Sequence, residues 1–141
     1  ACIAICGEAI GVMDAIMNST LEYIKSREQF GVSIGSFQVL QHRAVDMFNA
    51  LELSRAMVFR AADTLDSSDD RDNRAKAASA VKVQIGRAGK LIGQQSIQLH
   101  GGMGVTEEME IGQYFKRLTL LDTFLGNADY YLKEYSKMEF N

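Results

Sequence analysis

None of the 141 residues in this sequence is proline. A proline inside a helix removes a backbone hydrogen bond and clashes with the preceding turn, so a chain without proline can form long, uninterrupted helices. Apolar residues return every three or four positions over long stretches, which is the spacing of one helix face. Residues that enter helices at low cost, among them Ala, Leu, Met, Glu and Lys, are abundant. The sequence therefore predicts an all-α domain.

The apolar periodicity predicts three long helices and two shorter ones. Their expected ranges are residues 1–26, 37–65, 71–100, 106–125 and 127–137. Ser36 is the expected N-cap of the second helix, and Thr106, followed by two glutamates, is the expected start of the fourth. Short turns between long helices force neighbours to run antiparallel. We therefore expect an up-down four-helix bundle, completed by the short last helix, in one domain over residues 1–141.

Charge and cysteine content exclude several classes of protein. A net charge of −3 and a pI near 5.4 offer no general attraction to nucleic acid. Cys2 and Cys6 are too few for a disulfide framework or a four-ligand metal site, and we expect buried thiols. Glu8 and Asp14 interrupt the apolar first segment, which lacks the basic start of a signal peptide. We expect no membrane segment and a soluble intracellular protein, cytoplasmic in a bacterium. Because the chain starts without Met inside an amphipathic pattern, we also expect a fragment of a longer chain.

The first break in the helical pattern, at residues 27–36, holds an arginine, an aromatic residue and two glycines. At the end of a long helix, Arg27 can cap the last carbonyl groups and complement the helix dipole. Alternatively, its planar guanidinium meets a phosphate, with Gln38 as a second polar donor and Phe30 as a ring face nearby. The residue types alone leave both interpretations open.

The second break, at residues 98–104, reads Gln-Leu-His-Gly-Gly-Met-Gly and directly follows a predicted helix. A single glycine at this place is an ordinary helix terminator. Three glycines in four residues indicate a backbone that another group approaches closely, since only glycine lacks the Cβ that blocks such an approach. The segment is not the dinucleotide-binding fingerprint, because no strand precedes it and the spacing differs.

In order and spacing, these two breaks and the sequence Tyr-Phe-Lys-Arg at residues 114–117 resemble those of the C-terminal domain of acyl-CoA dehydrogenases. The resemblance covers essentially the whole chain. It implies that family's helical fold, FAD lying between subunits, and α,β-dehydrogenation of acyl-CoA thioesters. It also implies an acyl-CoA substrate, sister subunits in a homotetramer, dimer of dimers or hetero-oligomer, and an electron-transfer flavoprotein as partner.

The resemblance further implies a set of cofactor contacts. Arg27 would contact the pyrophosphate of an FAD held mainly by a neighbouring subunit, and Gln98 and Gly102 would touch its ADP portion. Asn127 and Asp129 match positions at which relatives usually carry Thr and Gln. The full set of expected FAD contacts is Arg27, Gln29, Phe30, Gln38, Gln98, Gly102, Asn127 and Asp129.

The catalytic base that the resemblance implies is missing from its usual place. In the family a glutamate commonly stands immediately before a Gly-Thr pair, and Leu125 occupies that slot here. Leucine cannot accept a proton. Other relatives carry the base at the start of the first helix, where Ala1 matches. Asp122 and Asp129 flank Leu125 at helical spacing and are candidates for a displaced base, although carboxylates at such places are more often surface or capping groups.

Two interpretations of function therefore stay open. One is a FAD-dependent acyl-CoA dehydrogenase domain, and the other is a non-catalytic helical subunit or scaffold that has lost the base. Arg117 stands where relatives carry an acid, which favours a branch resembling the small subunits of two-component dehydrogenases for dicarboxylic substrates such as pimeloyl-CoA. No metal site is expected, because neither His42 nor His100 has a second ligand at suitable spacing.

Overall fold

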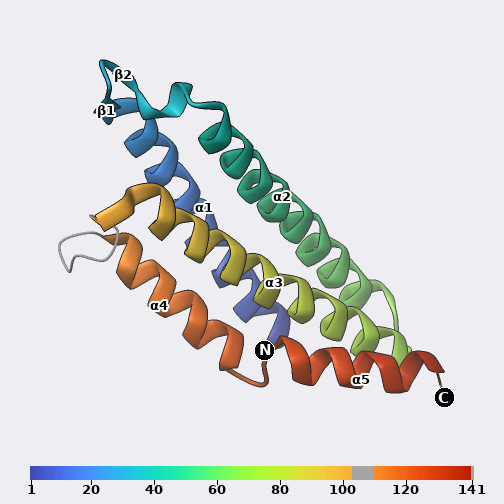
Figure 1. The fold of residues 1–141 in the computed structure, drawn as a ribbon. Coiled ribbons are helices and arrows are strands. Elements are labelled where there is room, and N and C mark those ends of the chain that lie inside the picture. Colours follow the sequence, from blue (N-terminus) through green and yellow to red (C-terminus); the bar gives the residue numbers. More distant parts are fainter. Residues whose placement is uncertain (103–109, 141) are drawn as a thin grey trace.

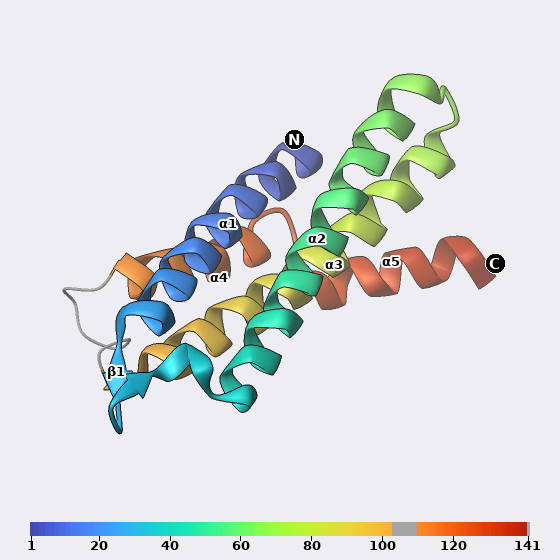
Figure 2. The ribbon, with the colours of Figure 1, turned by 90° about the horizontal axis from the view of Figure 1, so that it is seen from above.

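The computed structural model describes residues 1–102 and 110–140 and consists almost entirely of helices (Figure 1). Its elements are α1 (Cys2–Ser26), β1 (Glu28–Gln29), β2 (Val32–Ser33), the 3₁₀ turn η1 (Ile34–Ser36), α2 (Gln38–Ser67), α3 (Arg71–His100), α4 (Glu110–Thr123) and α5 (Ala128–Phe140). The helices α1 to α4 run alternately up and down, which confirms the predicted all-α, four-helix architecture (Figures 1 and 2). The last helix, α5, lies along the first half of α3.

The predicted helix ends are confirmed at most places and wrong at one. Ser36 is not the N-cap of α2, because Phe37 occupies that position and no side chain caps the helix. The Ser36 hydroxyl instead donates to the carbonyl oxygen of Ser33 at 2.7 Å, inside η1. The expected start of the fourth helix at Thr106 lies outside the described residues.

The core of the bundle forms around α3, which contacts α1, α2, α4 and α5. Apolar side chains from the four bundle helices are fully buried there, including Met13, Met47, Ile92 and Ile111. Burying one such side chain stabilises the folded state by roughly 1.5–3 kcal/mol. The three- and four-residue spacing of these side chains is therefore the main reason that the sequence adopts this fold.

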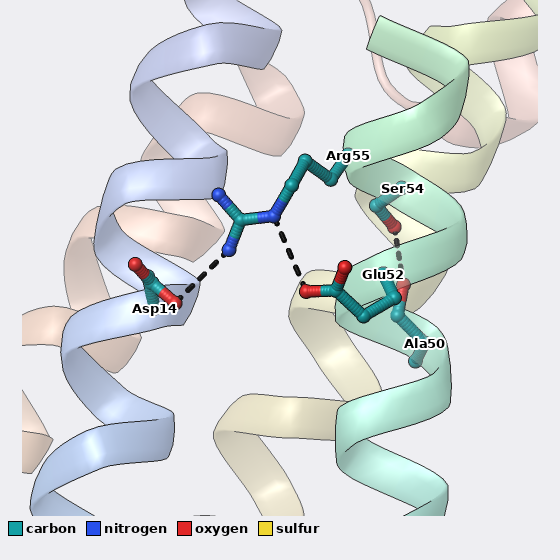
Figure 3. Close-up of polar contacts among 5 residues, drawn as sticks. All are labelled: Asp14, Ala50, Glu52, Ser54 and Arg55. Carbon is teal, nitrogen blue, oxygen red and sulfur yellow. Dashed lines mark hydrogen bonds and ion pairs between the residues drawn. The ribbon is translucent and has the colours of Figure 1, made fainter.

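The two acidic residues that interrupt the apolar face of α1 bind arginines on neighbouring helices. Arg55 of α2 donates from Nη2 to Asp14 of α1 at 3.1 Å and from Nε to Glu52 at 3.2 Å (Figure 3). Arg117 of α4 pairs with Glu8 of α1, with its Nε 2.7 Å from the carboxylate. Partly exposed pairs contribute only about 0–1 kcal/mol each, so they mainly fix how the helices lie against each other.

By length and composition, α1 could cross a membrane, with a mean hydropathy of 1.4 over its best 18-residue window. Core helices of water-soluble bundles have the same properties, because both kinds of helix need a long apolar surface. In this fold α1 packs between α2, α3 and α4, and Cys6, Met13 and Ile16 are fully buried. The core that α1 helps to form buries 33% of that window and so accounts for part of its apolar character.

Candidate functional site

The first sequence break folds into a small antiparallel hairpin that holds Phe30 at its tip. Gln29 pairs with Val32, which leaves Phe30 and Gly31 as a two-residue turn with φ of 56° and 80°. Positive φ at both turn residues is the geometry of a type I′ hairpin, in which a bulky residue such as Phe is strained. The Phe30 side chain is nevertheless 89% exposed. A strained, exposed aromatic ring is a feature that often accompanies a binding role.

The hairpin is attached rigidly to the end of α1. The Ser33 hydroxyl donates to the Ile24 carbonyl oxygen at 2.8 Å, and the Ile34 amide donates to the Arg27 carbonyl oxygen at 2.8 Å. The backbone of Gly35 lies so close that a Cβ there would stand 2.9 Å from the Ile24 oxygen. These contacts hold the hairpin in one orientation relative to the bundle.

Arg27 ends α1 through its backbone and leaves its side chain in solvent. Its amide donates to the Tyr23 carbonyl oxygen at 2.8 Å, and its extended backbone leads into β1. Within residues 1–102 and 110–140, no carboxylate pairs with its guanidinium and no helix carbonyl accepts from it. Gln38, also exposed, is the first residue of α2, whose first turn carries neither a capping side chain nor an acid. This part of the surface therefore suits an anionic group.

The second sequence break begins at the end of α3. Gly101 stops the helix with φ of 61°, and its amide donates to the Gln98 carbonyl oxygen. The Gln98 side chain and Gly102 are exposed. The remaining glycine of the motif, Gly104, lies outside the described residues.

One pair of side chains joins the two breaks. The Tyr23 hydroxyl donates to the carbonyl oxygen of His100 at 3.4 Å, and the Tyr23 ring stacks on the imidazole with 4.3 Å between ring centroids. The hairpin and the end of α3 therefore lie at the same end of the bundle, as Figures 1 and 2 show. Six of the eight predicted cofactor contacts belong to this end: Arg27, Gln29, Phe30, Gln38, Gln98 and Gly102.

The other two predicted contacts are Asn127, in the turn between α4 and α5, and Asp129, in the first turn of α5; this turn lies beside the N-terminus of α1 (Figure 1). The length of α1, 25 residues, separates the two groups by about 37 Å at 1.5 Å per residue. The Asn127 side chain accepts a hydrogen bond from the Tyr130 amide at 2.9 Å and so caps α5. Asp129 lies exposed in the first turn of α5, where its charge suits the positive end of the helix.

Leu125, which the resemblance aligns with the family's glutamate, lies in a turn with strained backbone geometry. Leu125 has φ of 63°, an unfavourable value for leucine, and is 50% exposed. Its carbonyl oxygen accepts from the Tyr131 hydroxyl at 3.0 Å. The Oδ1 of Asp122 accepts from the Ala128 amide at 3.2 Å and so helps start α5. The geometry thus gives Asp122 a capping role, the commoner of its two interpretations.

A buried lysine that the sequence reasoning missed supports the same turn. Lys82 of α3 is fully buried, and its Nζ donates to the carbonyl oxygens of Leu121 at 2.6 Å and Asp122 at 2.9 Å. These are among the last carbonyl groups of α4, which have no partner within the helix. The signal was present, since Lys82 follows Ala78 by four residues and precedes Ile85 by three, at core spacing.

Cys2 and Cys6 lie one helical turn apart near this turn, and only Cys6 is fully buried. A hydrogen bond from the Cys6 thiol is the main cause that lowers the pKa of Cys2 to about 6, with smaller contributions from the Tyr131 hydroxyl and the charge of Lys82. The same bond and burial raise the pKa of Cys6. The prediction of buried thiols is therefore confirmed for Cys6 and only partly for Cys2.

Three cavities that border α3 have no predicted cofactor contact in their lining. One of about 450 Å³ lies between α2, α3 and α5, one of about 270 Å³ lies between α3 and α4, and one of about 180 Å³ lies between α3 and α5. The predicted contacts instead form open surface. In the described part of the chain, no three His, Cys, Asp or Glu side chains gather closely enough to hold a metal ion.

Several known proteins are similar to this chain over most of its length. The family model for the acyl-CoA dehydrogenase C-terminal domain matches residues 2–136. Acyl-CoA dehydrogenase IpdE2 of Mycobacterium tuberculosis is 36% identical over 117 residues, which cover 83% of this chain and 34% of that protein. The caffeyl-CoA reductase-Etf complex subunit CarC of Acetobacterium woodii is 26% identical over 126 residues, covering 89% of this chain and 32% of that protein.

The solved structure of PigA with FAD and proline superposes on this chain with a TM-score of 0.89 at 27% identity. The match covers 97% of this chain and 35% of PigA. The chain thus spans about a third of the length of these relatives.

Proposed function

Because the chain belongs to the acyl-CoA dehydrogenase family, as its C-terminal domain, we propose that it contributes FAD contacts and subunit interfaces to an enzyme that dehydrogenates acyl-CoA thioesters. The observation that carries this proposal is the hairpin end of the bundle. There lie a guanidinium that no described carboxylate pairs with, an exposed aromatic side chain on a strained backbone, and an exposed glycine backbone.

The residues at this end fit the parts of FAD. The planar guanidinium of Arg27 suits the pyrophosphate, since a guanidinium binds phosphate oxygens through two parallel hydrogen bonds. The Phe30 ring offers an apolar face, and the amides of Gln29, Gln38 and Gln98 suit ribose or phosphate oxygens. Gly102 leaves room for a cofactor to pass close to the backbone.

The distance between the two groups of predicted contacts indicates how FAD is shared. Arg27 and Asn127 lie at opposite ends of α1, so we propose that each end faces a different FAD molecule. The hairpin end would contact an FAD held mainly by a neighbouring subunit. The α4–α5 end fits the cofactor less well, because the side-chain oxygen of Asn127 already caps α5 and the carboxylate of Asp129 repels phosphate.

When bound, FAD would supply the acceptor for the hydride that leaves the substrate, while removal of the α-proton needs a base. In this chain the residue at the usual place for that base is Leu125, and Asp122 is engaged as a cap. This observation favours a second candidate function, a subunit that binds FAD and leaves the proton transfer to another chain. In that case a paired subunit supplies the base.

Sister subunits are the partners that the surface supports best. The outer face of α2 carries Val45, Phe48 and Phe59, which are more than half exposed although apolar. Exposed apolar side chains gathered on one face are typical of an interaction surface. We propose that subunits of the same enzyme cover this face, and that an electron-transfer flavoprotein accepts the electrons, as the name of the Etf-complex relative suggests.

The proposal is tested by measuring FAD affinity of the full-length protein and its Arg27→Ala variant. Loss of a charged hydrogen-bond donor to phosphate costs about 1.5–3 kcal/mol, so affinity should fall roughly tenfold to a hundredfold. Arg71→Ala is the matched control, because Arg71 is exposed at the opposite end of α3. Equal FAD affinity in wild type and Arg27→Ala would reject the proposed contact.

A further inference from the structure

We propose that Tyr23 is a positioning residue for FAD binding. It does not contact the cofactor but aligns the two segments that do. The inference rests on the proposed function and adds a residue that neither sequence break contains. Tyr23 lies in the last turn of α1 and contacts both halves of the candidate cofactor surface.

The first contact of Tyr23 is with the residue proposed to bind phosphate. Its carbonyl oxygen accepts the Arg27 amide at 2.8 Å and the Ser26 hydroxyl at 3.2 Å. This bond ends α1 and sets the direction in which the chain leaves toward β1. The position of the Arg27 backbone is therefore tied to that of Tyr23.

The second contact is with the last residue of α3. The Tyr23 hydroxyl donates to the His100 carbonyl oxygen at 3.4 Å, and the two rings stack with an interplanar angle of 24°. His100 immediately precedes Gly101 and Gly102, so its carbonyl group lies at the start of the glycine backbone. Tyr23 thus links two segments more than seventy residues apart in sequence, since its backbone carbonyl binds Arg27 and its side chain binds the residue before the glycines.

The surroundings of His100 show that its ring is held in place for this stack. The ring is 98% buried, as only 2% of the residue is exposed, and Nδ1 lies 2.8 Å from the Ser96 carbonyl oxygen. Because a carbonyl oxygen can only accept a hydrogen bond, Nδ1 is the donor in this contact. Among the described residues Nε2 has no hydrogen-bond partner. The hydrogen bond to its own helix and the burial of the ring together hold the imidazole against Tyr23.

Tyr23→Phe tests the inference in the full-length protein, because it removes the hydroxyl and retains the ring. Loss of one hydrogen bond that aligns the two segments should weaken FAD binding roughly threefold to tenfold. Tyr114→Phe is the matched control, since its hydroxyl makes a bond of the same 3.4 Å length to Glu110 on the surface of α4. His100→Ala, which removes the stack and keeps the carbonyl group, should also weaken FAD binding.

A double-mutant cycle separates positioning from general destabilisation. If Tyr23 acts through Arg27, the effect of Tyr23→Phe on FAD affinity should shrink in the Arg27→Ala background, because coupled residues are not additive. The thermal midpoint of the FAD-free variants is measured alongside, and Tyr23→Phe should change it no more than Tyr114→Phe does.

An unchanged FAD affinity in Tyr23→Phe would overturn the inference and leave the proposed function intact. So would a Tyr23→Phe substitution that lowers FAD affinity by the same factor in the wild-type and Arg27→Ala backgrounds. A wild-type protein without affinity for FAD would overturn both.

Discussion

Gly86 of α3 faces the α4–α5 turn so closely that replacing it with alanine should disturb that turn. An alanine Cβ at this position would lie 2.2 Å from Oδ1 of Asp122 and 2.8 Å from the Cβ of Ala128. Asp122 would have to move away from the Ala128 amide that it caps. Gly89, one turn further along α3, is the matched control, because the nearest atom to its new Cβ would be Leu118 Cδ2 at 3.7 Å, an ordinary contact.

The expected magnitudes follow from three opposing effects. In a helix interior, alanine is favoured over glycine by about 1 kcal/mol at either position. At Gly86 the lost cap costs about 1 kcal/mol and the overpacking about 1–3 kcal/mol more. Gly89→Ala should therefore stabilise the protein by about 1 kcal/mol, whereas Gly86→Ala should destabilise it by about 1–3 kcal/mol.

The assay is denaturant unfolding of both variants, followed through the far-ultraviolet circular dichroism of the helices. Two variants with the same chemical change on the same helix should shift the midpoint in opposite directions. Equal shifts would refute the described packing of α3 against Asp122 and Ala128. So would a stabilised Gly86→Ala.

Three further predictions concern the same region. Lys82→Ala should lower the free energy of unfolding by about 2–4 kcal/mol in the same assay, because it creates a cavity and leaves two carbonyl groups without their hydrogen-bond donor. An unchanged free energy of unfolding would contradict the hydrogen bonds of the Lys82 ammonium group. Since the pKa of Cys2 is lowered to about 6 from 9.0, its thiolate should be present above that pH, so alkylation followed by mass spectrometry should show a midpoint near pH 6. Cys6 should stay unmodified in the folded protein. A midpoint near pH 9 for the alkylation of Cys2 would contradict the environment described for the Cys2 thiol. Leu125→Glu should give the full-length protein acyl-CoA-dependent bleaching or a shift of the flavin spectrum; no change in either would show that the slot is misassigned.

Helix positions could be predicted from sequence because they depend on local periodicity. The ranges of α1 and α3 follow directly from apolar residues at three- and four-residue steps. The N-cap expected at Ser36 is wrong because the 3₁₀ turn extends through Ser36, so that α2 begins at Gln38 with Phe37 in the cap position. The strands β1 and β2, two residues each, are too short to show a period, so the sequence indicates only a break in the helical pattern there.

The parts of the candidate site that could not be predicted depend on contacts between distant segments. Helical spacing placed Asp122 beside Leu125, but only the fold shows that its carboxylate caps Ala128. Lys82 and Tyr23 likewise bind carbonyl groups 39 and 77 residues away. Residue type and spacing reveal which groups are available, whereas tertiary structure decides which of them are already engaged.

The proposal that this domain contributes contacts to FAD is tested by the absorption spectrum of the full-length protein, purified without added cofactor. We expect flavin absorption bands at a ratio close to one FAD per chain, because the hairpin end of every subunit would contact a neighbour's cofactor. A spectrum without flavin bands, unchanged after incubation with FAD, would contradict it.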